Sequence, residues 1–285
     1  MVFAPVLSAV FRWIFIEAYS AEKRPADNWR KWYHCFRYGF WWGMDWHAYV
    51  FLFSILLVSV PGAFSPFWFS AGDSVRMAGI LLYGFVLYTA FLGRMIFYYH
   101  FHDVFNQTVL LGKHADKRNF ADIFFHQNHG AWLLLSYVPV MALMYAGVRG
   151  LLGLPSLPYP SLLADAPAAA RYAGNTAIVL AAVAFFYYMR YGGTFHHADK
   201  PEWDEIPPVV KEDVFFAKAT WDDLVRLEFI YKMPPKKLLS HTDAQALPIM
   251  DAVAPHEVWQ ADRMPLAPFV RAARGAKIAR PSHIF

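Results

Sequence analysis

Residues 77–99 read MAGILLYGFVLYTAFLGRMIFYY, a run of 23 residues that holds a single charge, Arg94. At a rise of about 1.5 Å per residue, a helix of this length crosses the roughly 30 Å of a bilayer's hydrocarbon core. This run is the third of five comparable apolar stretches along the chain. Whatever the protein does is therefore expected to be done in or beside a membrane.

The sequence predicts an all-α integral membrane protein with five transmembrane helices, interfacial helices and an extramembrane tail punctuated by prolines. The predicted spans are residues 2–19, 46–64, 77–99, 131–152 and 172–189. The first span is the weakest because Arg12 and Glu17 interrupt it, and we expect Arg12 to snorkel or to face other helices. It has no positive n-region before it and no small-residue cleavage site after it, so we interpret it as a retained span.

The connections between the predicted spans differ in composition. Residues 20–45 mix basic residues with tryptophans, which suits an interfacial helix at the level of the lipid headgroups. Residues 65–76 are expected to form a short turn, and residues 153–170, rich in Pro and Ala, a loop. Residues 100–129 are too polar to cross a bilayer, and their two apolar stripes predict two helices that lie along the interface.

The chain changes composition at residue 191, where charges and prolines become frequent. We predict an extramembrane linker over residues 191–285 rather than a domain with a large core. One helix is expected near residues 221–232. Its signal is a sequence with the form of a capping box, in which Thr220 is the N-cap and Asp223 takes the usual place of Glu.

Charge and cysteine content narrow the classes of partner. The net charge of +4 and the pI near 9.0 fit contact with anionic lipid headgroups as easily as with nucleic acid. No basic run, zinc-finger spacing or glycine-rich phosphate loop supports a nucleic-acid partner, so we expect none. The single cysteine, Cys35, excludes an intrachain disulfide and a cysteine-based structural zinc site.

Histidines offer an alternative function, because loop parity places them at one surface and histidine is a common ligand of zinc and iron. A di-metal site of the desaturase or hydroxylase type would draw on His100, His102, His126, His129, His196 and His197. Desaturases carry tighter, repeated histidine boxes, and His100 and His102 point to different faces of a helix. The competing interpretation is that interfacial histidines, like tryptophans, tolerate the boundary between water and lipid, so no metal ligand is assigned.

Arg94 is the most informative single charge. It lies deep in the third predicted span, where a charge is costly unless it has a partner. One interpretation is that it binds a lipid phosphate. The other is an arginine that snorkels or is structurally paired near a helix end.

Several phrases occur in a defined order around the predicted spans. They are RYGFWWGMD at 37–45, FYYHFHDVFN at 97–106, GGTFHHADKPEW at 192–203 and EDVFFAKATWDDLVRLEFIYKMPP at 212–235. In this order the chain resembles the membrane half of lipoteichoic acid synthases and related phosphoglycerol transferases, in the alkaline phosphatase and sulfatase superfamily. Gly43 and Asp45 match the glycine and aspartate of the family's phrase before its second span, whereas the family's Asn-Pro phrase is absent from the linker.

The resemblance implies a function for a longer protein. A metal-activated threonine or serine would take a phosphoglycerol or similar group from a lipid donor, with Mn or Mg in the catalytic domain. Residues 279–285 resemble the start of that domain's first strand, so its catalytic residues are expected after Phe285 and none is assigned here. The chain itself is expected to be an anchor and lipid-facing module without a cofactor. Its partners would be membrane lipids and a sulfatase-like domain, its own or separate.

The resemblance also implies contacts and an orientation. The residues expected at the donor headgroup or the catalytic domain are Arg37, Asp45, Arg94, Tyr98, Tyr99, His100, His102 and Asn106. A bacterial-type cell membrane with a cytoplasmic N-terminus and an outer tail is implied, although basic residues in the short loops favour the reverse. We follow the resemblance because these loop charges are interleaved with acids and aromatics. A third hypothesis is a non-catalytic membrane subunit whose tail binds a partner.

Overall fold

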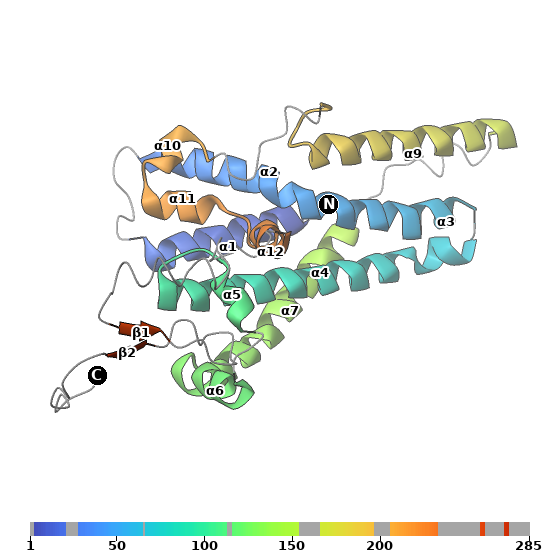
Figure 1. The fold of residues 1–285 in the computed structure, drawn as a ribbon. Coiled ribbons are helices and arrows are strands. Elements are labelled where there is room, and N and C mark those ends of the chain that lie inside the picture. Colours follow the sequence, from blue (N-terminus) through green and yellow to red (C-terminus); the bar gives the residue numbers. More distant parts are fainter. Residues whose placement is uncertain are drawn as a thin grey trace. The chain divides into compact units, whose positions relative to one another are not determined.

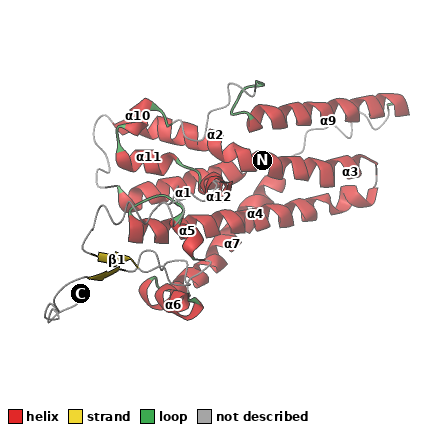
Figure 2. Ribbon diagram, viewed as in Figure 1, coloured by secondary structure: helices red, strands yellow, loops and turns green. Residues whose placement is uncertain are grey.

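The computed structural model describes residues 3–20, 28–64, 66–112, 116–153, 166–196, 206–232, 257–259 and 271–273. The chain divides into two units, Met1–Lys232 and Met233–Phe285. In the second unit, β1 (Glu257–Trp259) pairs with β2 (Arg271–Ala273) in antiparallel register, with Val258 opposite Ala272. In the first unit every regular element of the described residues is a helix (Figure 2).

Long helices build the first unit (Figure 1). They are α1 (Phe3–Tyr19), α2 (Asn28–Ser54), α4 (Pro66–Phe101), α7 (Gly130–Leu152) and α9 (Ala168–Arg190). Helix α2 continues through a π-helical turn, η1 (Ile55–Ser59), into α3 (Val60–Phe64).

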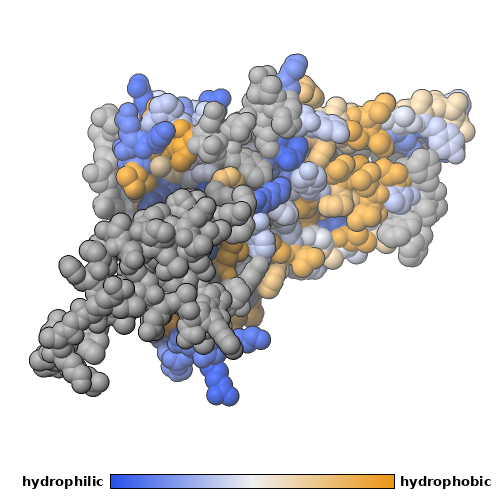
Figure 3. Space-filling model, viewed as in Figure 1, coloured by the Kyte–Doolittle hydropathy of each residue, from blue (hydrophilic) through white to orange (hydrophobic). Residues whose placement is uncertain are grey.

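Four helical stretches among the described residues are long and apolar enough to cross a membrane. They are Trp29–Gly62, Ala71–Phe101, Gly130–Leu152 and Ala168–Arg190. Helix α1, with 17 residues, is not among them. In Figure 3, hydrophobic side chains gather over α9, α3 and the neighbouring part of α4, whereas hydrophilic ones gather near α10. These features fit a multi-pass membrane protein.

Two of these helices are longer than the sequence predicts. Residues 28–45 are continuous with the second predicted span, and residues 66–76, expected as a turn, are helical. Pro61 does not end the second span, because it lies in the first turn of α3, directly after the π-helical turn. Near the start of a helix the missing N–H of proline is tolerated.

The segment between α4 and α7 departs from the two predicted interfacial helices. It contains α5 (Thr108–Leu111), α6 (Lys117–Asp122) and a π-helical turn, η2 (Ile123–Gln127). The chain leaves the helix at His102, whose φ of 49° lies in the left-handed region, so residues 102–107 are not helical. The first expected helix is therefore wrong over most of its length, while α6 and η2 agree with the second.

Residues 206–232 belong to the first unit. They form α10 (Pro208–Lys211), α11 (Val214–Thr220) and α12 (Asp223–Lys232), which pack on α1, α2 and α4. The side chains of Val210 and Val225 are fully buried. Trp221 stacks on Trp42 of α2, with ring centroids 5.1 Å apart. The structure thus places in the helical core a segment that the sequence assigned to the linker, and the unit ends after Lys232 rather than at residue 190.

Helix α12 begins close to its predicted position, but its cap differs from the prediction. The Oδ1 of Asp222 accepts hydrogen bonds from the amides of Leu224 and Val225, at 3.1 and 3.2 Å. The hydroxyl of Thr220 donates to the carbonyl of Phe216 at 2.7 Å. Thr220 therefore closes α11, and Asp222 caps α12.

The main core of the first unit lies where α1, α2, α4, α7 and the 206–232 segment meet. Its buried members are Phe15, Ile16, Cys35, Tyr88, Phe91, Met144, Val210, Phe216 and Ala219. Cys35, the single cysteine, is completely buried here. The members of the core come from α1, at the start of the unit, and from residues 206–232, at its end. This core therefore requires the 206–232 segment.

The start of α11 provides a test of this packing. The Oδ1 of Asp213 accepts from the amides of Phe215 and Phe216, at 3.0 and 3.1 Å, and Lys31 of α2 donates to its Oδ2 at 2.9 Å. We predict that Asp213→Ala lowers the free energy of unfolding by about 1–2 kcal/mol and speeds amide exchange across residues 214–220, as measured by hydrogen–deuterium exchange.

The matched control is Asp116→Ala. Asp116 caps α6 at an exposed position, where its Oδ1 accepts from the amide of Arg118 at 3.0 Å. This substitution is expected to leave exchange across residues 214–220 unchanged. Equal exchange in the two variants would mean that the Asp213 cap does not hold α11.

Candidate functional site

Two arginines from different helices converge on the end of α11. Arg12 of α1 donates from Nε to the carbonyl of Ala219 at 3.1 Å. Arg94 of α4 donates to the carbonyls of Lys218 and Trp221, at 3.1 and 3.3 Å. We name this arrangement the arginine clamp, made of Arg12, Arg94 and the main chain of residues 218–221. Carbonyls at a helix C-terminus lack intrahelical donors and carry partial negative charge, which suits guanidinium groups.

Both arginines are buried, at 4% exposure each. Space for Arg12 exists because residue 39 is glycine: a Cβ there would lie 2.1 Å from the Arg12 Cζ. The Arg94 guanidinium lies over the Phe15 ring, 3.9 Å from its centroid. Carbonyls, and for Arg94 also the Phe15 ring, thus replace part of the water that each cation loses on burial, although the Arg94 Nε is buried without a hydrogen-bond partner.

Asp223 completes the clamp as its anion. Its Oδ1 lies 3.2 Å from the NH1 of Arg94, and its side chain is only 19% exposed. Burial raises the pKa of Asp223 to about 6, although the neighbouring Arg94 lowers it. The desolvation of this carboxylate therefore outweighs its attraction to the arginine. The Asp223–Arg94 ion pair therefore orients these two side chains more than it stabilises the fold.

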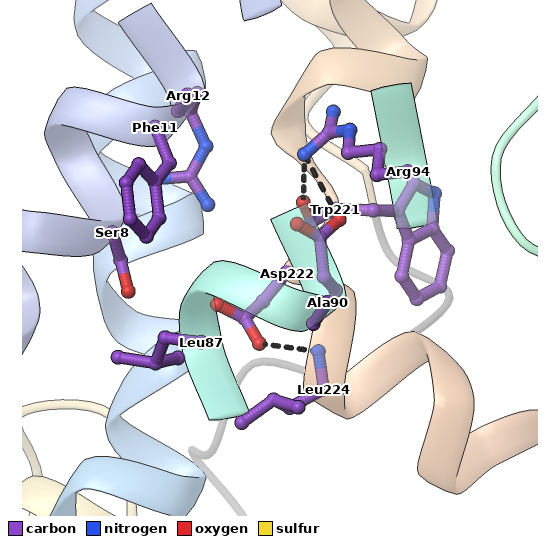
Figure 4. Close-up of a pocket in the computed structure, with 10 residues that line it drawn as sticks. Ser8, Phe11, Arg12, Leu87, Ala90, Arg94, Trp221, Asp222 and Leu224 are labelled. Carbon is purple, nitrogen blue, oxygen red and sulfur yellow. Dashed lines mark hydrogen bonds and ion pairs between the residues drawn. The ribbon is translucent and has the colours of Figure 1, made fainter. Parts of the chain in front are cut away.

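A small cavity of about 20 Å³ lies between α1, α4 and the start of α12. Figure 4 shows Phe11 and Arg12 on one side of it, with Arg94 and Trp221 on the other. Its lining residues are Ser8, Phe11, Arg12, Leu87, Ala90, Arg94, Trp221, Asp222, Asp223 and Leu224. This volume is enough for a water molecule and too small for an organic substrate.

A chain of polar side chains links α1, α2 and α4 near this cavity. His47 hydrogen-bonds to the Tyr83 hydroxyl through Nδ1 at 2.8 Å and to the Ser8 hydroxyl through Nε2 at 3.3 Å. A Cβ on residue 43 would lie 3.0 Å from the Asp222 Oδ2 and 3.2 Å from the His47 Nε2, so Gly43 lets these groups approach α2. Although serine and histidine can form a nucleophile and base, the second nitrogen here faces a tyrosine rather than an orienting carboxylate. The hydrogen bonds among Ser8, His47 and Tyr83 thus link α1, α2 and α4.

The loop after α4 is also bound by cations of the 206–232 segment. The Lys218 Nζ donates to the His102 carbonyl at 2.6 Å, and the Arg226 Nε donates to the Phe105 carbonyl at 2.7 Å. Asn106 orders the loop itself, because its Oδ1 accepts from the amide of Thr108 at 2.9 Å. His102 and Asn106 thus lie in a loop that contacts α11 and α12 through its main chain.

The other contact candidates are spread over the unit. Asp45 is buried and pairs with Arg190 at the end of α9. Tyr98 packs edge-on against Phe15, with ring centroids 5.0 Å apart. Arg37, Tyr99 and His100 are exposed. The structure therefore does not bring the eight candidates together at one site.

The described histidines of the proposed metal set do not converge either. Among the described residues, no group of three or more His, Cys, Asp or Glu side chains is placed to hold a metal ion. His100 hydrogen-bonds to Asn128 at 2.8 Å, while His126 pairs with Asp122 on the exposed surface. His129 precedes α7 with a φ of 53°, and His196 is exposed after α9. His197 lies outside the described residues.

Sequence reasoning singled out Arg94 but missed the partners that hold it. Two signals were present: Arg12 and Arg94 are charges within apolar helices, and an acidic pair, Asp222 and Asp223, stands in the tail. The link from Ser8 through His47 to Tyr83 had no sequence signal, because its members lie 39 and 36 positions apart.

Comparison with known proteins gave no match, whether with protein-family models, with curated proteins or with solved structures.

The raised pKa of Asp223 gives a testable pH dependence. Because the folded-state pKa is about 6 and the ordinary value is 3.8, the folded protein binds more protons than the unfolded chain between these pH values. The contribution of Asp223 to stability therefore grows as the pH falls through 6. The stability of wild type relative to Asp223→Asn, which cannot titrate, should therefore rise by on the order of 2–3 kcal/mol between pH 7 and pH 4.

The measurement is thermal unfolding in detergent from pH 4 to pH 7.5, with the difference between variant and wild type as the readout. Comparing the two proteins at each pH removes the titration of all other groups. A difference that does not change with pH would show that Asp223 titrates as an ordinary surface carboxylate.

Proposed function

We propose that this chain is the membrane module of a lipid-dependent enzyme, and that it holds the polypeptide after Lys232 at a fixed place beside the bilayer. The observation that carries the proposal is the arginine clamp. It binds residues 218–221 to α1 and α4, which start far away in the sequence. The segment from which the polypeptide continues beyond α12 is therefore fixed to α1 and α4. Such anchoring raises the effective concentration of an attached domain near its lipid substrate.

The class of enzyme comes from the resemblance to lipoteichoic acid synthases and related phosphoglycerol transferases. In that family a sulfatase-like catalytic domain with a divalent metal, Mn or Mg, would come after the linker. We propose that this domain, its own or separate, is the partner of the chain, together with membrane lipids. The membrane module contributes position, and the transfer chemistry belongs to the attached domain.

The proposal retains five spans, with α1 as the first. Seventeen residues of helix cover about 25 Å, so α1 would need a locally thin bilayer or the shelter of α2 and α4 to cross. Five spans place the N-terminus and the tail on opposite sides of a bacterial-type cell membrane. The resemblance favours a cytoplasmic N-terminus and an outer tail.

The family assignment has a direct test in the coding sequence downstream of codon 285. An in-frame strand that contains a metal-binding glutamate, with a threonine or serine nucleophile further on, is the expected result. A stop codon immediately after Phe285, with no separately encoded sulfatase-like partner, would overturn the assignment.

The anchoring itself is tested by removing one arginine. Arg94→Gln leaves Asp223 without its cation and two carbonyls without donors, so the docking of residues 206–232 should weaken by about 3–5 kcal/mol. Spin labels at Tyr231→Cys and Tyr99→Cys, both at exposed positions, report the distance between α12 and α4 by pulsed electron resonance. We expect one narrow distance distribution in the parent protein and a broad one in Arg94→Gln.

The control is Arg37→Gln, because Arg37 is an exposed arginine of α2. Cys35 is buried and should not take up label. Arg12→Gln should broaden the distribution as Arg94→Gln does. A distribution that stays narrow in both clamp variants would show that other contacts hold the tail.

A further inference from the structure

A second cavity, separate from the clamp, opens between α2–η1 and α4. Its volume is about 490 Å³, and the N-terminal end of α1 and Leu224 of α12 border it. Its walls run from Trp46 to Val58 on one side and from Val75 to Val86 on the other. Most of these side chains are apolar. We name this cavity the α2–α4 groove.

The groove has the length of one lipid leaflet. From Val75 to Val86 a helix rises by about 16 Å, and half of a bilayer's hydrocarbon core is about 15 Å. Both walls belong to helices that are long and apolar enough to cross a membrane. An apolar cavity of this kind does not hold water well, and with these helices in a bilayer the medium around its opening would be hydrocarbon.

The two ends of the groove differ in polarity. At the inner end, His47 and Tyr83 already hydrogen-bond to each other, so they do not require a polar ligand. At the other end lies Arg76, which donates to the Ser59 hydroxyl at 3.0 Å and to Asp73 at 3.1 Å. Asp73 is 69% exposed, and such a surface ion pair is weak. Arg76 can therefore also bind an anionic oxygen at the membrane surface.

We propose that the α2–α4 groove binds one acyl chain of a phospholipid from the leaflet next to the α3–α4 connection, with the lipid phosphate at Arg76. The acyl chain lies along α4 and ends near His47 and Tyr83. Arg76 lies about 27 Å along α4 from Arg94, so the proposed phosphate position is distinct from the arginine clamp. The proposal depends on the helices lying in a bilayer and not on any domain attached after Lys232, so the two proposals can fail separately.

A glycine in the groove allows the site to be filled without disturbing the helices. Gly79 borders the groove, and a Cβ built there meets no atom within 4 Å. Gly150 of α7 has the same open surroundings but does not border the groove. Gly79→Phe should therefore occupy the groove, while Gly150→Phe adds the same side chain elsewhere on a membrane helix.

The experiment is native mass spectrometry of the full chain released from nanodiscs of palmitoyl-oleoyl phosphatidylglycerol and phosphatidylcholine in equal amounts. We expect one tightly retained phospholipid per chain in the parent protein and in Gly150→Phe. In Gly79→Phe the retained fraction should fall about tenfold or more, because excluding only two methylene groups already has that effect. Arg76→Gln should lower retention as well, by removing the phosphate contact.

A second pair of variants distinguishes loss of lipid binding from misfolding of Gly79→Phe. Leu82 borders the groove and Leu143 does not, and their side chains are 67% and 73% exposed. Leu82→Trp should reduce retention and Leu143→Trp should not, with circular dichroism showing the same helix content in both. Equal retention in the parent protein and in both groove variants would overturn the proposal. So would a dimer in the nanodisc that Gly79→Phe or Leu82→Trp abolishes, since a second copy of the chain would then fill the groove.

Discussion

The fold depends on the neutralisation of two cations that apolar helices carry into the protein interior. A guanidinium group that leaves water loses a large solvation free energy, and only fixed dipoles or an anion can replace it. Here the replacement comes from carbonyls at the end of α11 and from Asp223. Since these groups belong to residues 218–223, α1 and α4 cannot bury Arg12 and Arg94 unless the later segment folds onto them. The requirement links the beginning of the chain to its last described helices.

The same requirement explains why residues 206–232 pack closely despite a composition typical of linkers. Three short helices of 4, 7 and 10 residues would be marginal by themselves in water. Their stability comes from buried side chains such as Val210 and Phe216 and from cations that bind main-chain oxygens. Lys218 and Arg226 of this segment bind carbonyls of the loop after α4 in the same manner. Arginines of α1 and α4 thus bind carbonyls of the segment, and cations of the segment bind carbonyls of the loop after α4.

The apolar runs of the third, fourth and fifth predicted spans were sufficient to locate α4, α7 and α9, because helix length and lack of charge follow directly from the chain. An interfacial helix was predicted within residues 20–45, but its continuity with the second span was not, and the first turns of α4 were missed. Polar or proline-containing residues can continue a helix where packing compensates for them. Residues 102–107 were assigned to a helix by their apolar spacing, yet His102 adopts a left-handed conformation that no periodicity reveals. The partners of Arg94 lie more than 120 positions away, so their pairing is decided by tertiary packing.

The arginine clamp recognises the main chain at residues 218, 219 and 221 and not their side chains. A carbonyl oxygen is present whatever residue occupies the position, so those three residues are free to vary in polarity as far as the clamp is concerned. Arg12, Arg94 and the small residue at position 39 have no such freedom, because each supplies a particular shape or charge. The clamp itself should therefore restrict evolutionary drift at these positions of α1, α2 and α4, whereas at residues 218, 219 and 221 any restriction comes from the packing of their own side chains.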